Sequence, residues 1–268
     1  MTASPIASLQ MYWMPEVADD VDAWWRGLRE HLVRQGIGDA PEKLSFPDDI
    51  HSVWHDPGLV LSQTCGGPLI TELGDMVRVV GTPSYDTPLT DGIKYQSAVI
   101  VRRDDPARSL ADLRGRRAAV NGRESFSGYH ALRGALADVV EPGETFFSGV
   151  VVSGAHQLSL RAVAAGTADC AAIDAVCFAA FEKVRPEQHA AVRVLATTPA
   201  VPGLPYITRG DASDEELEML RRGVEAAFAD EALADVRRRL MLGDFQRTDA
   251  ADYAPIARTI EKGLNVVL

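Results

Sequence analysis

The sequence predicts an α/β fold, in which helices cover both faces of a parallel or mixed sheet. Strand-like apolar segments alternate with segments whose apolar residues recur at helical spacing, and a second series of this kind follows the first. The chain has 268 residues, of which 46% are hydrophobic and 24% charged. This composition is typical of a globular protein with one large domain or two smaller ones. No apolar run approaches the ~18 residues that a membrane-spanning helix needs.

The first series begins with a strand at 6–12 and an amphipathic helix. One face of that helix carries its apolar residues, which are Val17, Val21, Trp24, Trp25, Leu28 and Leu32. Acidic residues in its first turn and Gly36 just past its end agree with the helix dipole and with C-cap geometry. Further strands are predicted at 59–62, 76–81 and 95–102, and Gly66-Gly67-Pro68 begins another helix.

The second series begins with a short capped turn at 109–113. Strands are predicted at 117–121, 150–153, 170–174 and 192–196, and they alternate with helices at 127–139, 157–165 and 175–184. The proline-rich segment 198–205 is typical of a linker. After it, helices are predicted at 214–229, 231–241 and 251–263.

Charge and cysteine content exclude several classes of protein. The net charge is -11, which argues against nucleic acid or an anionic membrane as the partner. A small anion is still compatible, because backbone dipoles bind anions without net positive charge. The three cysteines show no CxxC spacing, so neither a disulfide framework nor a zinc site is expected. Residues 1–17 have no basic and apolar leader pattern, so no export signal is expected.

Loops that lead from strands into helices are the places to look for a ligand, because open α/β sheets bind ligands at the carboxyl ends of their strands. One such loop, 121–129, carries Ser125, Ser127 and Gly128. The two hydroxyls and the N–H groups of Gly128 and Tyr129 suit a tetrahedral oxyanion. The simpler alternative is that one serine only caps the helix.

Three further loops of this kind each carry a candidate. They contribute Thr64 from the loop 62–68, His156 from 153–157 and Asp174 from 171–175. Thr64 precedes two glycines at a helix start, where a plain tight turn is an equal explanation. His156 lies in a first helical turn. Asp174 is either a helix cap or an acceptor for an amine on the ligand.

Metal and enzyme chemistry have weaker support. His51 and His55 have i,i+4 spacing, but the sequence offers no HExxH motif and no third ligand, so no metal is expected there. GxSxG, GxGxxG and P-loop motifs are absent from the sequence, and no nucleophile–base pair is evident. The sequence therefore predicts a protein that is not an enzyme and that uses no cofactor.

Taken in order, these loops resemble the substrate-binding proteins of phosphate, phosphite and phosphonate ABC transporters. The resemblance covers residues 60 to 207 and rests on three motifs: Ser109-Leu110-Ala111-Asp112-Leu113-Arg114-Gly115, Ser125-Phe126-Ser127-Gly128-Tyr129, and Ser153-Gly154-Ala155-His156 with Ile173-Asp174 further on. Their order and spacing are more specific than any one of them.

The resemblance implies two α/β lobes of the periplasmic-binding-protein type with the ligand in a cleft between them. Lobe one would comprise 1–97 and 204–268, and lobe two 98–203, with only two crossovers, near 96–103 and 198–207. In the family, the serine-rich helix start and the histidine hold the oxyanion, which points to Ser125, Ser127, Gly128 and His156. The family's aspartate position contacts an amine and points to Asp174. Contacts from lobe one correspond to Tyr12, Thr64 and Tyr95.

The resemblance also implies a function, a location and partners. The protein would bind a small phosphonate- or phosphate-like anion, with or without an amine arm, for ABC-type uptake or for sensing, with an ABC permease as partner. Phe126 stands where the family often has a third hydroxyl, which favours a less charged or partly apolar ligand. The family is periplasmic, whereas this N-terminus suggests a cytosolic sensor as an alternative. The other alternative is a cytosolic enzyme on the same fold, such as a pyrimidine-precursor synthase of thiamine biosynthesis, which would call for a cysteine-rich iron site beyond Cys65.

Overall fold

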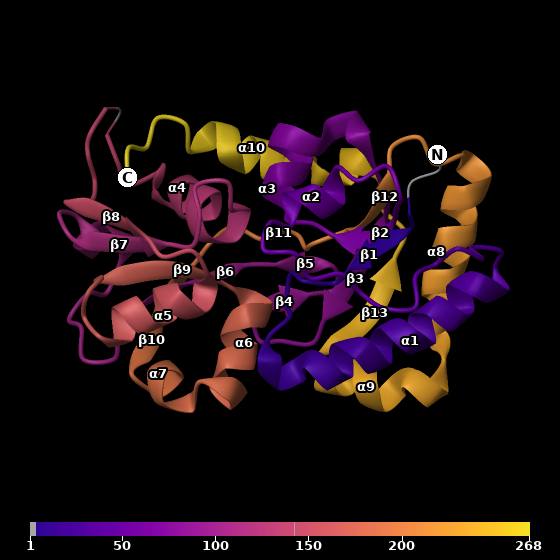
Figure 1. The fold of residues 1–268 in the computed structure, drawn as a ribbon. Helices are drawn as coiled ribbons and strands as arrows, with labels where there is room; N and C mark the ends of the chain where they lie inside the picture. Colours follow the sequence, from indigo (N-terminus) through magenta and orange to yellow (C-terminus); the bar gives the residue numbers. More distant parts are fainter. Residues whose placement is uncertain (1–3, 142) are drawn as a thin grey trace. The chain divides into compact units, whose positions relative to one another are not determined.

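The computed structural model describes residues 4–141 and 143–268, and these fold into two compact units (Figure 1). Unit 1 contains residues 4–86, 91–93 and 202–253. Unit 2 contains residues 87–90, the described part of 94–201, and 254–268. Short strands β4 (Thr90–Asp91) and β11 (Val201–Pro202) lie where the chain passes from one unit to the other. Among the described residues, no helix combines the length and the apolar character needed to cross a bilayer.

Unit 1 is a five-stranded mixed sheet with helices packed against it. Its strands are ordered β1-β2-β12-β3-β13, in which β1 and β2 are parallel while β12 and β13 run antiparallel to their neighbours. Its elements are β1 (Ile6–Ser8), α1 (Ala18–Arg34), α2 (His51–Trp54), β2 (Leu59–Gln63), α3 (Gly66–Pro68), the π-helical turn η2 (Leu69–Leu73), β3 (Val77–Tyr85), β12 (Tyr206–Arg209), α8 (Asp214–Ala229), α9 (Ala234–Arg239) and β13 (Leu242–Gln246).

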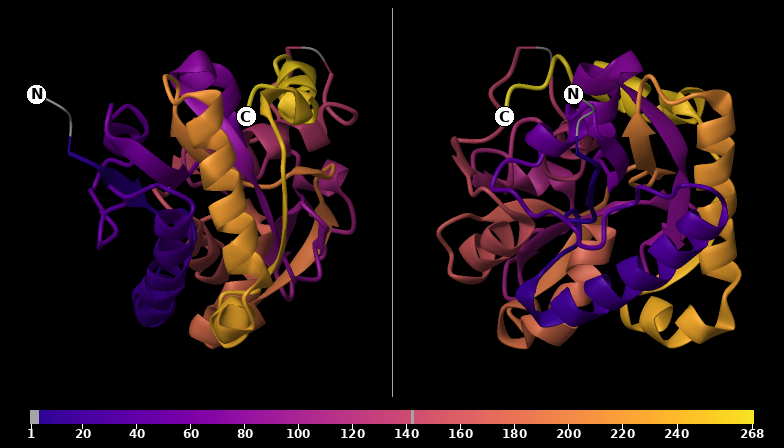
Figure 2. Two further views of the ribbon diagram at one scale, coloured as in Figure 1. Left: turned by 90° about the vertical axis from the view of Figure 1, so that its right-hand side faces the viewer. Right: turned by 45° about the vertical axis from the view of Figure 1, so that its right-hand side comes forward.

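The core of unit 1 forms around the amphipathic helix α1. The residues of α1 that are buried in this core, including Trp24, Trp25 and Leu28, are those that the sequence pattern places on one face of the helix. α1 packs beside α8 (Figure 2), where Gly223 lets the two backbones come close: a Cβ at this position would lie 3.0 Å from Leu32 Cα. The indole N–H of Trp24 donates to the Tyr206 hydroxyl at 3.4 Å, which ties α1 to β12.

Unit 2 is a second five-stranded mixed sheet, ordered β10-β6-β9-β7-β8. β7, β8 and β9 are parallel, and β6 runs antiparallel to β9 and to β10. Its elements are β5 (Lys94–Tyr95), β6 (Ser97–Arg102), β7 (Arg117–Val120), the π-helical turn η5 (Phe126–His130), α4 (Ala131–Leu136), β8 (Gly149–Val152), α5 (His156–Ala164), β9 (Cys170–Asp174), α6 (Ala175–Val184), α7 (Pro186–Ala190), β10 (Val192–Thr197) and α10 (Ala254–Lys262).

The order of strands makes the end of β7 the natural ligand position in unit 2. β7 lies between β8 and β9, so the chain moves to one side of β7 and then returns to the other. This reversal is a topological switch point, beyond which open α/β sheets bind ligands. The loops after β7, β8 and β9 begin at this edge of the sheet and carry Ser125, Ser127, His156 and Asp174.

The expected lobe boundary is wrong at the C-terminus. Residues 254–268 were expected in the first lobe, but they belong to unit 2, where α10 packs beside α4 (Figure 1). Arg133 of α4 donates to the carbonyls of Leu264 and Val266 at 2.9 and 3.0 Å, and Val266 joins the unit 2 core. The chain therefore also passes from unit 1 to unit 2 at 253–254, in addition to its passages at 86–87, 90–91, 93–94 and 201–202, so the expectation of only two crossovers is also wrong.

Two strands were missed in the mostly helical segment after residue 205, and both lie outside the stretches expected to be helices. β12 lies between β2 and β3 in the unit 1 sheet, and β13 pairs with β3 at its edge. Both strands are short, and alternation of buried and exposed residues is visible only in β13. The strand signal in the sequence is therefore weak compared with the helical signal of α8. The alternation of strands and helices before residue 198 is confirmed, as is a mixed sheet flanked by helices in each unit.

The packing of the C-terminal segment predicts a contrast between two neighbouring valines. Val266 is 3% exposed in the unit 2 core, whereas Val267 is 48% exposed. We expect Val266→Ala to lower the free energy of unfolding by about 1.5–3 kcal/mol, because it removes two buried methyl groups and leaves a cavity. Val267→Ala, as the control, should change it by less than about 0.5 kcal/mol. Urea unfolding measures both, and equal effects would contradict the assignment of this segment to the core of unit 2.

Candidate functional site

The centre of the candidate site is a contact between the loops after β7 and β8. The hydroxyl of Ser127 and Nε2 of His156 are 2.9 Å apart. The backbone holds the same two loops together, because the N–H of Gly154 donates to the carbonyl of Asn121 at 3.0 Å. A Cβ on Gly128 would collide with Asn121 Oδ1 and lie 3.3 Å from His156 Cε1. Glycine at this position therefore lets the three side chains meet.

His156 is neutral in this environment. Burial lowers the pKa of its imidazole from 6.5 to about 4. The neutral ring carries one N–H, and its tautomer decides what Ser127 can do. If Nε2 carries the proton and donates to Ser127 Oγ, the serine O–H is left to donate to a ligand oxygen. Nδ1 is then an acceptor, and it is buried without a hydrogen-bond partner in the described part of the chain.

Ser125 has the capping role that was the simpler alternative for one of the serines. Its side chain accepts a hydrogen bond from the N–H of Gly128 at 3.2 Å and so caps η5. The N–H of Gly128, expected as a ligand donor, is therefore engaged with Ser125. The O–H of Ser125 can still donate, because the oxygen accepts the cap bond through a lone pair. Phe126, between the two serines, is 1% exposed.

Asp174 lies at the end of β9 and caps α6. Its Oδ1 accepts from the N–H groups of Val176 and Cys177 at 2.8 and 3.3 Å. Burial, and secondarily the Asp174 carboxylate, raise the pKa of the Cys177 thiol well above its usual value. A cap uses only part of a carboxylate's acceptor capacity, so contact with an amine on the ligand stays a prediction.

Ser97 lies beside Asp174 in the unit 2 sheet, and Tyr95 belongs to the short strand β5 just before it, which pairs with β4 and β11. Ser97 begins β6 and pairs in register with Asp174, and Tyr95 is 3% exposed in β5. The Ser97 N–H donates to Thr198 Oγ1 at 2.8 Å, whereas its own Oγ is buried without a partner in the described residues. Ser97 was not predicted from the sequence, because a serine at a strand start carries no signal of its own.

Two predicted contacts, Tyr12 and Thr64, belong to unit 1. The Tyr12 ring packs edge-on against Tyr85 with centroids 5.0 Å apart. Thr64 is fully buried at the end of β2, where its N–H donates to the carbonyl of Pro205 at 3.1 Å and its Oγ1 donates to that of Cys65 at 3.3 Å. The participation of both residues in binding stays a prediction, and so does their convergence with Ser125, Ser127 and His156.

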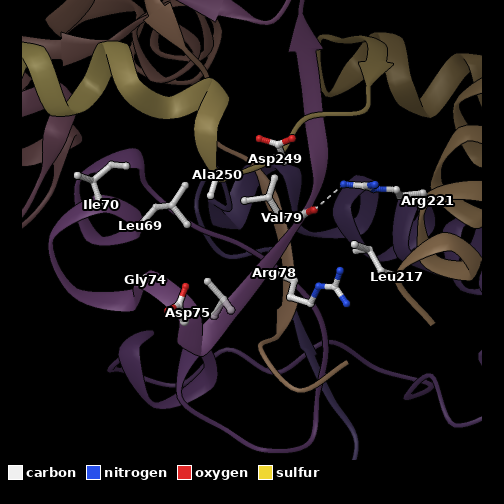
Figure 3. Close-up of a pocket in the computed structure, with 11 residues that line it drawn as sticks. Leu69, Ile70, Gly74, Asp75, Arg78, Val79, Leu217, Arg221, Asp249 and Ala250 are labelled. Carbon is white, nitrogen blue, oxygen red and sulfur yellow. Dashed lines mark hydrogen bonds between the residues drawn. The ribbon is translucent and has the colours of Figure 1, made fainter. Parts of the chain in front are cut away.

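Unit 1 also holds a pocket of about 500 Å³ that contains none of the predicted residues (Figure 3). Leu69, Ile70 and Leu217 supply apolar walls, and Arg78, Arg221 and Asp249 supply charge. Arg221 donates to the carbonyls of Val79, Val80 and Thr248, as the figure shows for Val79. Arg78 donates to Ala212 O and Asp214. Both guanidinium groups therefore already have hydrogen-bond acceptors within unit 1.

The two histidines weighed as metal ligands lie on the surface of unit 1. His51 Nδ1 and His55 Nε2 are 2.8 and 3.5 Å from Glu72 Oε1. Across residues 4–141 and 143–268, no group of three or more His, Cys, Asp or Glu side chains is placed to hold a metal ion.

Asn121 is the main residue of the cluster that the sequence did not single out. Its Oδ1 is buried against Gly128 and has no hydrogen-bond partner among the described residues. Its position as the first residue after β7 was the available signal. An Asn followed by Gly is so common in plain turns that this signal is weak.

The comparison with protein families decides between the alternatives. Residues 73–253 match the model of a family described as the periplasmic substrate-binding protein of phosphonate ABC transporters. The chain belongs to this family. The resemblance seen in the sequence is therefore confirmed, and so is a solute-binding role. Membership implies a small anion as ligand and an ABC permease as partner, and it does not favour the thiamine-precursor synthase.

Solved structures support the same fold. The chain is similar to a binding protein component of an ABC phosphonate transporter from Pseudomonas aeruginosa, with a TM-score of 0.73, 20% identity, and 96% of this chain and 85% of that chain covered. It is also similar to PhnD1 from Prochlorococcus marinus in complex with methylphosphonate, with a TM-score of 0.70, 16% identity, and 97% and 99% covered. A third similar structure is that of a chloride-bound Xanthomonas citri protein, with a TM-score of 0.74, 15% identity, and 98% of each chain covered. No curated protein matches this phosphonate-family chain.

The lowered pKa of His156 predicts how this member of the family responds to acid. The unfolded imidazole titrates near 6.5 and the folded one near 4, so the unfolded state binds more protons between these values. The contribution of His156 to stability is present above pH 6.5 and is lost as the pH falls toward about 4. In an NMR titration, the His156 ring resonances should stay constant from pH 8 to pH 5.5. A midpoint near pH 6.5 would contradict the burial argument.

Proposed function

We propose that this protein binds a phosphonate, or a phosphorus oxyanion of the same shape, at the cluster formed by Ser127, His156 and Asn121 in unit 2. The observation that carries the proposal is the 2.9 Å contact between Ser127 and His156 at the carboxyl ends of β7 and β8. It brings a hydroxyl donor to a strand end where α/β folds bind ligands. The family match and the similarity to a methylphosphonate complex support the same ligand class.

The charge of the protein limits how the anion is bound. With a net charge of -11, long-range attraction of an anion is weak, and His156 is neutral. Affinity must therefore come from short-range donors, namely the hydroxyls of Ser125 and Ser127 and the N–H of Tyr129, because the N–H of Gly128 already donates to Ser125. Each hydrogen bond to a charged acceptor contributes about 1.5–3 kcal/mol.

The finer features of the proposal concern the ligand and the setting. An amine arm on the ligand would be bound by Asp174, while Tyr12, Thr64 and Tyr95 would supply further contacts. The function in this proposal is uptake or sensing in the periplasm together with an ABC permease, without chemical conversion of the ligand.

Calorimetric titration with methylphosphonate tests the proposal. Ser127→Ala should weaken binding by about 10- to 150-fold, because it removes one donor to a charged oxygen. Ser125→Ala should also lower stability by about 1 kcal/mol, because it removes the cap of η5.

Ser148→Ala is the matched control, because the Ser148 hydroxyl is exposed at the opposite end of β8 and donates to the Arg116 carbonyl. This variant should bind like the wild type. If the wild type does not bind methylphosphonate, or if folded Ser127→Ala binds it equally well, the proposal is wrong.

A further inference from the structure

The loop after β7 presents an acceptor where the proposed site otherwise presents donors. Asn121 follows β7 directly, and its carboxamide lies against Gly128 at the start of η5. Oδ1 is buried and has no hydrogen-bond partner among residues 4–141 and 143–268. Buried polar atoms in folded proteins nearly always have a partner, so such an atom calls for an explanation. A ligand that donates a hydrogen bond supplies one.

The surroundings define what that ligand must offer. When His156 donates through Nε2, the Ser127 hydroxyl is left to donate, so it binds an ionised oxygen. Asn121 Oδ1 only accepts, and an ionised oxygen placed beside it would be repelled. His156 Nδ1 is a second buried acceptor when the ring donates through Nε2 to Ser127. A tetrahedral oxyacid that keeps one hydroxyl proton satisfies both kinds of group.

We propose that Asn121 is a specificity-determining residue that accepts the proton of a P–O–H group, so that the site selects the monoprotonated form of a phosphorus oxyanion. This inference rests on the proposed function and goes further, because it names the protonation state of the ligand. It also predicts rejection of sulfate, which has the same shape but carries no proton near neutral pH. A site built to pair with a hydroxyl discriminates strongly against an analogue that lacks it.

The proton in question belongs to the ligand. The titratable groups on the elements beside Asn121 are Arg123 and Glu124 in its own loop, His130 of η5, His156 of α5 and Asp174 at the end of β9. Of these groups, the two histidines each have a pKa below its usual value, mainly because of burial, and His156 is the one in contact with Ser127. The pKa of His156 is about 4, so the ring in contact with Ser127 is neutral between pH 6 and pH 9, and in this range the titration of the ligand governs binding.

Calorimetry of the full chain with methylphosphonate and with sulfate, from pH 6 to pH 9, tests the inference. Above the second pKa of methylphosphonate, the affinity should fall about tenfold per pH unit, because only the monoprotonated fraction binds. Sulfate should bind at least about 100-fold more weakly than methylphosphonate at pH 6. Asn121→Ala should flatten the pH dependence and reduce the preference over sulfate at least about tenfold. Ser148→Ala, the control at the other end of β8, should keep both.

The outcomes separate this inference from the proposed function. Absence of methylphosphonate binding at every pH overturns both. Binding that does not change with pH, or sulfate binding within tenfold of methylphosphonate, overturns the inference alone, and these wild-type results decide it even if Asn121→Ala does not fold. A pH dependence that persists in Asn121→Ala and disappears in His156→Gln also overturns it, because the proton would then belong to the histidine.

Discussion

The hydrogen bond between Ser127 and His156 is the interaction on which the candidate site depends. It joins the loops after two neighbouring parallel strands, and the pairing of β7 with β8 sets the separation of those loops. Gly128 leaves room for it, because a Cβ at this position would lie 3.3 Å from His156 Cε1 and would collide with Asn121 Oδ1. The position of the site therefore depends on the register of β7 with β8 and on a glycine at position 128.

Burial gives this cluster its chemical character. It keeps His156 neutral, so the histidine positions Ser127 and does not supply positive charge. In the proposed binding mode, an anion is held by oriented hydroxyl and N–H dipoles at close range. Such binding tolerates the acidic composition of the chain, since it does not depend on long-range attraction. It also makes the site sensitive to where each ligand proton lies, because every hydrogen bond has a fixed direction.

The sequence was sufficient to predict the alternation of strands and helices, the family and the meeting of Ser127 with His156, whereas the wider convergence with Ser125 and the loop at Thr64 stays a prediction. These follow from local signals: apolar periodicity, and hydroxyls and glycines at strand ends. The place of α10 could not be predicted, because an amphipathic pattern shows that one face is buried but not against which helix. Asn121 was missed for a related reason. Its unpaired Oδ1 depends on a contact with Gly128 that only the folded backbone creates. For Asp174, the sequence left a cap and a ligand contact open, and the structure shows the cap.

The most direct measurement of the central claim is an NMR titration of the backbone amides of the full chain with methylphosphonate. The account predicts that the largest shifts fall on Gly128, Tyr129, Gly154 and His156, where the loops after β7 and β8 meet. If the largest shifts fall instead on residues of the unit 1 pocket, such as Leu217 and Arg221, the anion binds elsewhere and the account is contradicted.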